Sequence, residues 1–450
     1  MSMRSLAWAW CPPPLKRVWQ RLEASPLGYR LAHGAFWSLV GAVISRALAL
    51  LAAILVARQL GPEGFGELGI IQSTVGMFGV FAGFGLGMTA TKYVAEFRRK
   101  DPAKAGRIMA MSGMVALISG GAVTAVLIGL APWLATHTLA APQLSGLLQD
   151  GGGLLFLGAL NGAQTGALAG FEAFRTIAVV NFWGGVANFP LMVGGVYLAG
   201  LRGAVWGMVA ALAVGWVLNH WALRLEARRF GVPFGWEGCW RESKVLFSFS
   251  LPALLSMIMV GPVNWACAAM LVNQPEGYRE MGIFNAANQW FTALLFLPGI
   301  LGQVVLPILS ERIGHKDNKS SKKVLSLSIK LNVFCTAPIV VILCFFSGYI
   351  MALYGQNFSS GSLTLIVISI TAFLVSIQNS VGQFIAASNV MWIGFLMNLG
   401  WALFFLIITL AIVDWGSLGL ATARGIAYFM HSFWVFIYAI NLLNKKEVTV

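Results

Sequence analysis

The chain has 450 residues, of which 58% are hydrophobic and only 10% are charged. An ordinary soluble domain carries about 25% charged residues, so this composition excludes a soluble globular protein and indicates an integral membrane protein. The net charge of +14 does not indicate nucleic acid binding, because the cations lie in short breaks between apolar runs. The lipid bilayer is the expected surrounding, and no nucleic acid partner is predicted.

The apolar runs predict an all-α integral membrane fold. A membrane-spanning helix needs about 20 mostly apolar residues, and about twelve runs of suitable length follow one another along the chain. In chain order the predicted spans are Ala35–Ala57, Leu68–Thr91, Ile108–Ala131, Leu154–Phe171, Ile177–Leu198, Ala204–Ala222, Val245–Leu271, Ile283–Leu309, Leu331–Met351, Leu363–Ala387, Met391–Val413 and Leu418–Leu442.

The 30 Lys and Arg residues are distributed very unevenly between the two sets of loops. One set of loops and both termini hold 25 of them, the opposite set holds only Arg58, Arg202 and Arg279, and Arg46 and Arg424 fall inside spans. Because cytoplasmic loops are enriched in Lys and Arg, both termini are predicted to be cytoplasmic. No secretory apolar run precedes Ala35, so no cleaved signal peptide is expected. The five Cys lack CxxC spacing, which indicates neither a disulfide framework nor a metal site.

A nine-residue stretch occurs twice. The chain reads PEGFGELGI at Pro62–Ile70 and PEGYREMGI at Pro275–Ile283. Six predicted crossings separate the copies, so both lie on the same side of the membrane, as in a parallel repeat. Two six-helix halves related by an axis along the membrane normal are a recurring plan of secondary transporters, with the substrate path between them. Gly64 and Gly277 are interpreted as structural turn residues.

This repeat divides the chain into predicted units around a central cavity. They are a basic cytoplasmic N-terminal segment (1–34), an N-terminal six-helix half (35–223), a basic cytoplasmic linker (224–244), a C-terminal six-helix half (245–443) and a cytoplasmic tail (444–450).

Two motifs carry a family resemblance. The stretch ARQLGPEGFGELGIIQS at Ala57–Ser73, the stretch TATKYVAEFRRK at Thr89–Lys100 and the 6+6 layout resemble the O-antigen and capsule polysaccharide flippases of the multidrug/oligosaccharidyl-lipid/polysaccharide exporter superfamily. The resemblance implies a bacterial inner-membrane protein that moves an undecaprenyl-pyrophosphate-linked oligosaccharide from the cytoplasmic to the outer leaflet by alternating access. It also implies a polyprenyl-pyrophosphate-linked glycan as ligand and a glycan polymerase or chain-length protein as partner.

Arg46 is the foremost candidate for substrate binding. It lies about eleven residues, or roughly 16 Å, from either end of its predicted span, where a charge costs at least ~2.5 kcal/mol. It is therefore expected to face a wet cavity, where its guanidinium matches phosphate oxygens, or an internal partner. Arg424 and Lys92 are further candidates for cavity cations. Arg424 could instead pair with Asp414, and Lys92 could simply follow the positive-inside rule.

Uncharged amides within the spans form a second candidate set. They either bridge helices or line a wet path suited to sugar hydroxyls, and both readings stay open for Gln72, Asn161, Gln164, Asn264, Asn288 and Gln289. Glu67 and Asp414, at outer ends of spans, are candidates for ion coupling. His431, inside the last span, is interpreted as a hydrogen-bonded structural histidine that could also titrate.

Other functions are less compatible with the sequence. No GxxxxGK[ST] motif occurs, so the chain is not expected to be an ATP-driven pump, and its energy source stays open. A glycan polymerase or glycosyltransferase would need a larger outer loop with catalytic groups, so no enzyme and no cofactor are predicted. A multidrug exporter of the same superfamily would favour buried carboxylates rather than Arg46. A flippase for a peptidoglycan precursor and a scaffold for glycan assembly remain alternatives.

Overall fold

The computed structural model describes residues 26–243, 245–246, 250, 258–314, 317–388 and 390–448. Most of the predicted N-terminal segment, part of the seventh predicted span and the last two residues lie outside these ranges. The described residues form helices and no strand. The longer helices are α3 (Pro26–Gly83), α4 (Leu86–Phe97), α5 (Pro102–Trp133), α7 (Gly152–Gly170), α8 (Phe174–Arg229), α10 (Val260–Val272), α11 (Gly277–Leu294), α12 (Phe296–Gly314), α13 (Asn318–Phe345), α15 (Ser362–Ala387), α16 (Met391–Ile412) and α17 (Gly416–Val448). Shorter elements are η1 (Leu134–Thr138), η2 (Pro142–Leu144), α6 (Ser145–Asp150), η3 (Cys239–Glu242), α14 (Ser347–Ala352), η5 (Gln356–Gly361) and η6 (Val413–Trp415).

The described residues contain 6 helical stretches that are long and apolar enough to cross a membrane. They are Ala42–Phe97, Pro102–Thr138, Phe174–Arg229, Lys319–Phe345, Gln356–Ala387 and Ile393–Leu443. The first and third are 56 residues long, whereas the hydrocarbon core needs only about 20. Each of them contains a break that separates two of the predicted spans.

Glycines make these breaks. In α3 the helical path is interrupted at Gly61, with φ 71° and ψ 178°, a conformation that glycine adopts without strain. Pro62 then opens the next helix, where its missing N–H is no loss. In α8 the break falls at Ala199 and Gly200, the latter with φ 55°. These positions agree with the predicted boundaries between spans.

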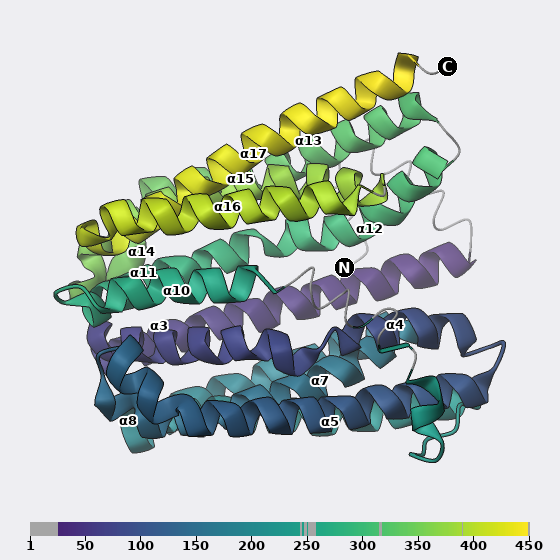
Figure 1. The fold of residues 1–450 in the computed structure, drawn as a ribbon, viewed down its shortest axis with the longest axis horizontal. Coiled ribbons are helices and arrows are strands. Elements are labelled where there is room, and N and C mark those ends of the chain that lie inside the picture. Colours follow the sequence, from purple (N-terminus) through teal and green to yellow (C-terminus); the bar gives the residue numbers. More distant parts are fainter. Residues whose placement is uncertain are drawn as a thin grey trace, which may run out of the picture.

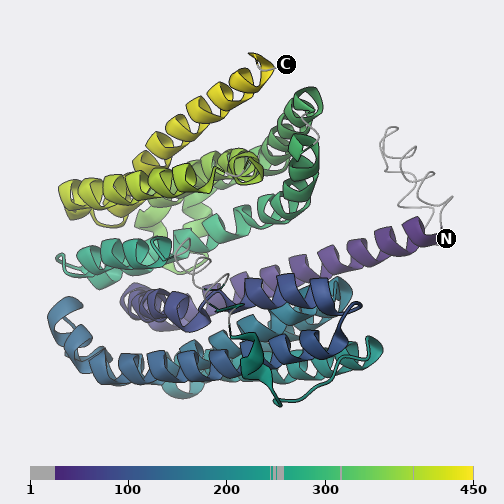
Figure 2. The same ribbon diagram turned by 45° about the vertical axis from the view of Figure 1, so that its right-hand side comes forward.

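The helices are arranged in two groups, one above the other in Figure 1. The N-terminal group contains α3 to α8, and the C-terminal group contains α10 to α17. Helix α3 makes the main junction by packing against α11 and α10. In Figure 2 the start of α3 and the end of α17 point toward the same end of the molecule. The main hydrophobic core continues through both groups, from Val56 and Phe65 to Phe284 and Phe405.

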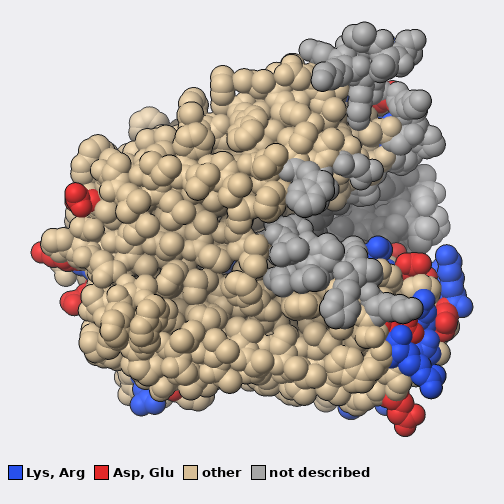
Figure 3. Space-filling view, viewed as in Figure 1, with Lys and Arg blue, Asp and Glu red and all other residues tan. Residues whose placement is uncertain are grey.

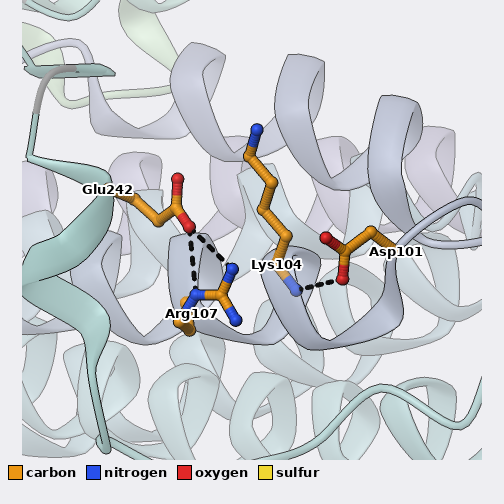
Figure 4. A network of polar contacts seen from close by, with 4 residues as sticks. All are labelled: Asp101, Lys104, Arg107 and Glu242. Atoms are coloured by element: carbon orange, nitrogen blue, oxygen red, sulfur yellow. Dashed lines mark hydrogen bonds and ion pairs between the residues drawn. The ribbon is translucent and has the colours of Figure 1, made fainter.

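The segment that leaves the N-terminal group is fixed to α5. Asp101 caps this helix by accepting from the Lys104 backbone N–H at 2.9 Å, and two turns later Arg107 pairs with Glu242 of η3 at 2.9 Å (Figure 4). Gly106 faces the carbonyl of Pro233 so closely that no side chain fits there. The connection between the groups is therefore docked on the N-terminal group as far as Glu242.

Charged side chains gather at the two ends of the molecule. Figure 3 shows a broad band without Lys, Arg, Asp or Glu between them, with most of the visible Lys and Arg at one end. We call this the basic end; it carries the Arg98–Glu172 and Arg107–Glu242 pairs. The opposite end, which contains Gly61, is called the Gly61 end. A wide uncharged belt of this kind matches the hydrocarbon region of a bilayer.

Candidate functional site at the junction of the two helix groups

The two copies of the repeated motif pack directly against each other. A Cβ on Gly66 would overlap the carbonyl oxygen of Tyr278, and a Cβ on Gly282 would overlap the carbonyl oxygen of Pro62. Gly69 faces the side-chain amide of Asn285 with equally little space. Because only glycine permits such backbone contact, glycines of the two motif copies join α3 to α11. We call this contact the glycine seam.

Hydrogen bonds across the junction surround the glycine seam at the Gly61 end. Tyr278 Oη donates to the Leu139 carbonyl at 2.7 Å, and Asn273 Nδ2 donates to the Thr138 carbonyl at 2.7 Å. Arg58 Nε donates to the carbonyl of Leu353. Burial and, secondarily, the Glu67 carboxylate raise the pKa of Tyr278, which keeps its phenol protonated as a donor. This end of the junction is therefore closed by backbone contacts and hydrogen bonds.

Aromatic rings complete the closure. Phe65 of the first motif copy contacts both Tyr354 and Phe358, with ring centroids 6.4 and 6.2 Å away. All three side chains are buried. Phe65 belongs to the N-terminal group and the other two to the C-terminal group, so this cluster also spans the junction.

Arg46 lies at the same junction, away from the glycine seam. Its side chain is exposed, and its Cζ lies 5.5 Å from the centroid of the Phe296 ring at the start of α12. The neighbouring Ser45 donates to the Asn181 carbonyl at 3.2 Å, which orients this face of α3 against α8. A guanidinium held over an aromatic ring keeps its edge available for an anion.

The other two candidate cations occupy different surroundings. Lys92 is exposed on α4, toward the basic end, with Nζ 4.9 Å from the centroid of the Tyr93 ring. Arg424 is buried inside the C-terminal group, with 8% of its surface exposed, and its Nη1 donates to Asn288 Oδ1 at 2.7 Å. The structure does not bring the three cations together in one cluster.

Most of the candidate amides connect helices. Asn161 donates to the Leu212 carbonyl at 3.0 Å and accepts from Asn219 at 2.9 Å, and Gln72 donates to Met208 Sδ at 3.2 Å. With the oxygen and nitrogen of its side-chain amide exchanged, Gln164 makes two hydrogen bonds with Trp216. Asn264 donates to the carbonyl of Val260 in its own helix, and Gln289 is half-buried.

The candidate carboxylates for ion coupling lie at the Gly61 end. Glu67 is half-buried and accepts from Gln143 at 3.4 Å. Asp414 is exposed in η6 and does not pair with Arg424. Among the described residues, no group of three His, Cys, Asp or Glu side chains is arranged to hold a metal ion.

The glycine-rich run at Gly76–Gly87 contains a further helix break. Helix α3 ends at Gly83 and α4 begins at Leu86, with positive φ angles of 43° at Phe84 and 64° at Gly85. A cavity of about 390 Å³ lies beside this break, between α3, α4 and α7. Beyond it, Gly87 and Gly166 bring α4 and α7 into backbone contact.

The fold and the junction define a multi-spanning helical membrane protein. Of the solved structures, a multidrug resistance transporter of the MATE family in an inward-facing conformation superposes with a TM-score of 0.74 at 14% identity, covering 90% of this chain and 96% of the other. The lipid II flippase in an inward closed conformation superposes with a TM-score of 0.70 at 15% identity, covering 92% and 90%. These likenesses establish the fold.

Residues 31–313 match the family of polysaccharide biosynthesis proteins, and the chain belongs to that family. It is 24% identical to the EPS I polysaccharide export inner membrane protein of Ralstonia nicotianae, over 86% of this chain and 85% of the relative. It is 25% identical to a putative O-antigen transporter of Shigella flexneri, over 75% and 80%. It is 27% identical to the lipid III flippase of Escherichia coli, over 69% and 74%.

Proposed function

We propose that this protein flips a polyprenyl-pyrophosphate-linked oligosaccharide from the cytoplasmic to the outer leaflet of a bacterial inner membrane. The relatives are named as polysaccharide exporters and flippases, which supports a transporter and not an enzyme. The substrate would be an O-antigen, capsule or exopolysaccharide repeat unit. A glycan polymerase or chain-length protein would act on the product.

The observation that carries the proposal is the position of Arg46. An exposed guanidinium in an apolar span is costly unless it faces water or an anion. Arg46 of α3 lies 5.5 Å from the Phe296 ring of α12, so a ligand bound beside Arg46 would contact both helix groups. A pyrophosphate offers the oxygen pairs that a guanidinium binds with two parallel hydrogen bonds. Lys92, nearer the basic end, would attract the same anion on its way in.

The contacts at the junction support alternating access. The glycine seam and its hydrogen bonds close the Gly61 end, which is the outer side if the basic end is cytoplasmic. The protein in this state would receive its substrate from the cytoplasm. Release would require the glycine seam to separate while the basic end closes.

The proposed topology has twelve crossings in two six-helix halves, residues 35–223 and 245–443. The breaks at Gly61, Gly200 and η6 each divide one of the 6 apolar stretches into two crossings, and α7, α10 and the pair α11 and α12 would supply the other three. The segments 1–34, 224–244 and 444–450 would then lie in the cytoplasm. The end of α17 and the start of α3 at one end of the molecule (Figure 2) are consistent with an even number of crossings.

The test is flipping of a fluorescent undecaprenyl-pyrophosphate oligosaccharide in proteoliposomes. Arg46→Ala should reduce the initial rate at least tenfold, the effect of losing one hydrogen bond to a charged group, and Arg46→Lys should retain part of it. Arg202→Ala is the matched control, because Arg202 is an exposed arginine of the Gly61 end that pairs with Asp150 at 2.8 Å. Its rate should equal that of the native chain.

One outcome would reject the role of Arg46, and another would reject the proposed function. Equal rates for native protein and Arg46→Ala would assign Arg46 a structural role. Transport of organic cations by a native chain that does not flip the lipid would identify a multidrug exporter.

A further inference from the structure

The interior of the C-terminal group contains buried N–H donors without acceptors. Among the described residues, nine buried side-chain polar atoms lack a hydrogen-bond partner, and eight of them belong to the C-terminal group. Three of the eight are Arg424 Nε, Trp401 Nε1 and His431 Nε2. Buried polar atoms are nearly always paired, so such a set indicates a missing partner.

Arg424 is a buried charge without a counter-charge. Its Nη1 donates to the neutral Asn288 Oδ1, and its Cζ lies 3.9 Å from the centroid of the Phe291 ring. No carboxylate of the described residues lies within ion-pair distance of it. Arginine stays protonated in proteins, and an amide and a ring do not cancel its charge. The interior therefore retains one uncompensated positive charge.

The hydrogen-bond network assigns the proton of His431. Ser432 Oγ donates to Gln378 Oε1 at 2.7 Å, which turns the Gln378 Nε2 toward His431 Nδ1 at 2.6 Å. With the Gln378 amide in this orientation, its Nε2 donates to His431 Nδ1, and the proton of the neutral ring is then on Nε2. His431 is 8% exposed, and its orphaned atom is thus a donor.

Trp401 brings a third donor to the same region. It is 3% exposed, and its ring centroid lies 5.3 Å from that of Tyr428. Arg424 Cζ lies 5.9 Å from the centroid of the same Tyr428 ring, so the unpaired donors of Arg424 and Trp401 both lie beside this ring. His431 lies on the same face of α17, one turn further along the helix.

We propose that this interior binds a small monovalent anion of the halide class, chloride under cellular conditions. A ligand that satisfies unpaired N–H donors must be a hydrogen-bond acceptor. A ligand that balances the charge of one guanidinium must carry one negative charge. A water molecule would accept a hydrogen bond but would leave the charge unbalanced. Arg424 supplies the charge, and Trp401 supplies a neutral donor beside the same Tyr428 ring. The site lies inside the C-terminal group, so it does not depend on the proposed flipping function.

The test measures anion binding by the purified full-length protein without any lipid substrate. Its thermal unfolding midpoint is compared in sodium chloride and sodium gluconate at constant ionic strength. The midpoint should rise with chloride concentration, since a ligand that binds only the folded state stabilises it. Arg424→Met should abolish this rise, while Arg202→Met, which removes an exposed arginine, should retain it. Crystals grown in bromide should show an anomalous peak beside Arg424 Nε.

A milder variant covers the case in which Arg424→Met does not fold. Trp401→Phe keeps an aromatic ring against Tyr428 and removes only the N–H donor. It should fold and bind chloride about tenfold more weakly, as expected for the loss of one hydrogen bond to a charged group. Equal midpoints in chloride and gluconate, unchanged chloride affinity in Trp401→Phe, or ordered water without bromide beside Arg424 would each overturn the proposal.

Discussion

Gly282 is predicted to be the least replaceable residue of the glycine seam. A methyl group there would overlap the Pro62 carbonyl oxygen and approach the Gly66 backbone N–H. These are backbone atoms that cannot rotate away, so Gly282→Ala should destabilise the protein by about 1–3 kcal/mol, measured by thermal unfolding in detergent. Gly299→Ala in α12 is the matched control, because nothing lies within 4 Å of its Cβ position. Equal midpoints for the two variants would contradict the glycine seam.

Sequence analysis identified single candidate residues where their chemistry conflicts with a membrane. Arg46 stands out because a charge inside an apolar span is expensive, and in the structure it is exposed beside Phe296; its role in binding stays a prediction. The partner of Arg424 was not predictable. Sequence proximity suggested Asp414, whereas the structure pairs Arg424 with Asn288, 136 residues away in the chain. Local periodicity contains no information on such long-range pairs.

The cap of α13 gives a pH-dependent prediction. Asp317 Oδ1 accepts from the Ser320 backbone N–H at 3.0 Å, and hydrogen bonds from Ser320 lower the pKa of Asp317. A lowered folded-state pKa means that the cap stabilises the first turn above the ordinary carboxyl pKa of about 3.9. This stabilisation is lost as the pH falls through the lowered value. Hydrogen exchange at Ser320, corrected for its intrinsic pH dependence, should reveal this loss, and Asp317→Asn should remove it.

The ion pair that holds η3 on α5 is predicted to contribute to stability. Arg107 and Glu242 are 28% and 13% exposed, whereas Arg279 and Glu276 are 47% and 67% exposed. Double-mutant cycles on thermal stability should give a coupling of about 1 kcal/mol for the first pair and near zero for the second, since exposed pairs contribute little. If the coupling energy of Arg107 and Glu242 is no larger than that of Arg279 and Glu276, this pair does not hold η3 on α5.

Helix breaks were predictable where glycine and proline coincide. Pro62 and Gly64 indicate a turn in the sequence, and the structure breaks the helix at Gly61, immediately before Pro62. The break between α3 and α4 was less evident, because Phe84 adopts a positive φ of 43° and no sequence rule favours that conformation for phenylalanine. Helix α4 packs against α7 through Gly87 and Gly166 beside this break. The sequence of α3 and α4 alone does not predict this packing.

At the scale of the molecule, the repeat indicated that its two copies lie on one side of the membrane. It did not indicate that they touch. That contact depends on how the two helix groups are oriented, and the sequence specifies this only through dispersed pairs such as Tyr278 with Leu139. The all-helical fold followed from composition, whereas the closed Gly61 end is a property of one conformation. Alternating access requires a second conformation in which those pairs separate.

Joining the two groups at the Gly61 end should therefore stop transport. The native cysteines are first replaced by alanine. Phe65→Cys and Phe358→Cys are then introduced, at positions whose native ring centroids lie 6.2 Å apart, and the two thiols are joined by a short bis-maleimide. Because the glycine seam must open for release, crosslinking should reduce flipping in proteoliposomes by at least tenfold. Tyr354→Cys with Phe358→Cys is the matched control, because these rings are 5.9 Å apart but belong to one group. Its crosslinked form should flip at the rate of its uncrosslinked form, and undiminished flipping by the crosslinked Phe65 pair would mean that the outer side opens elsewhere.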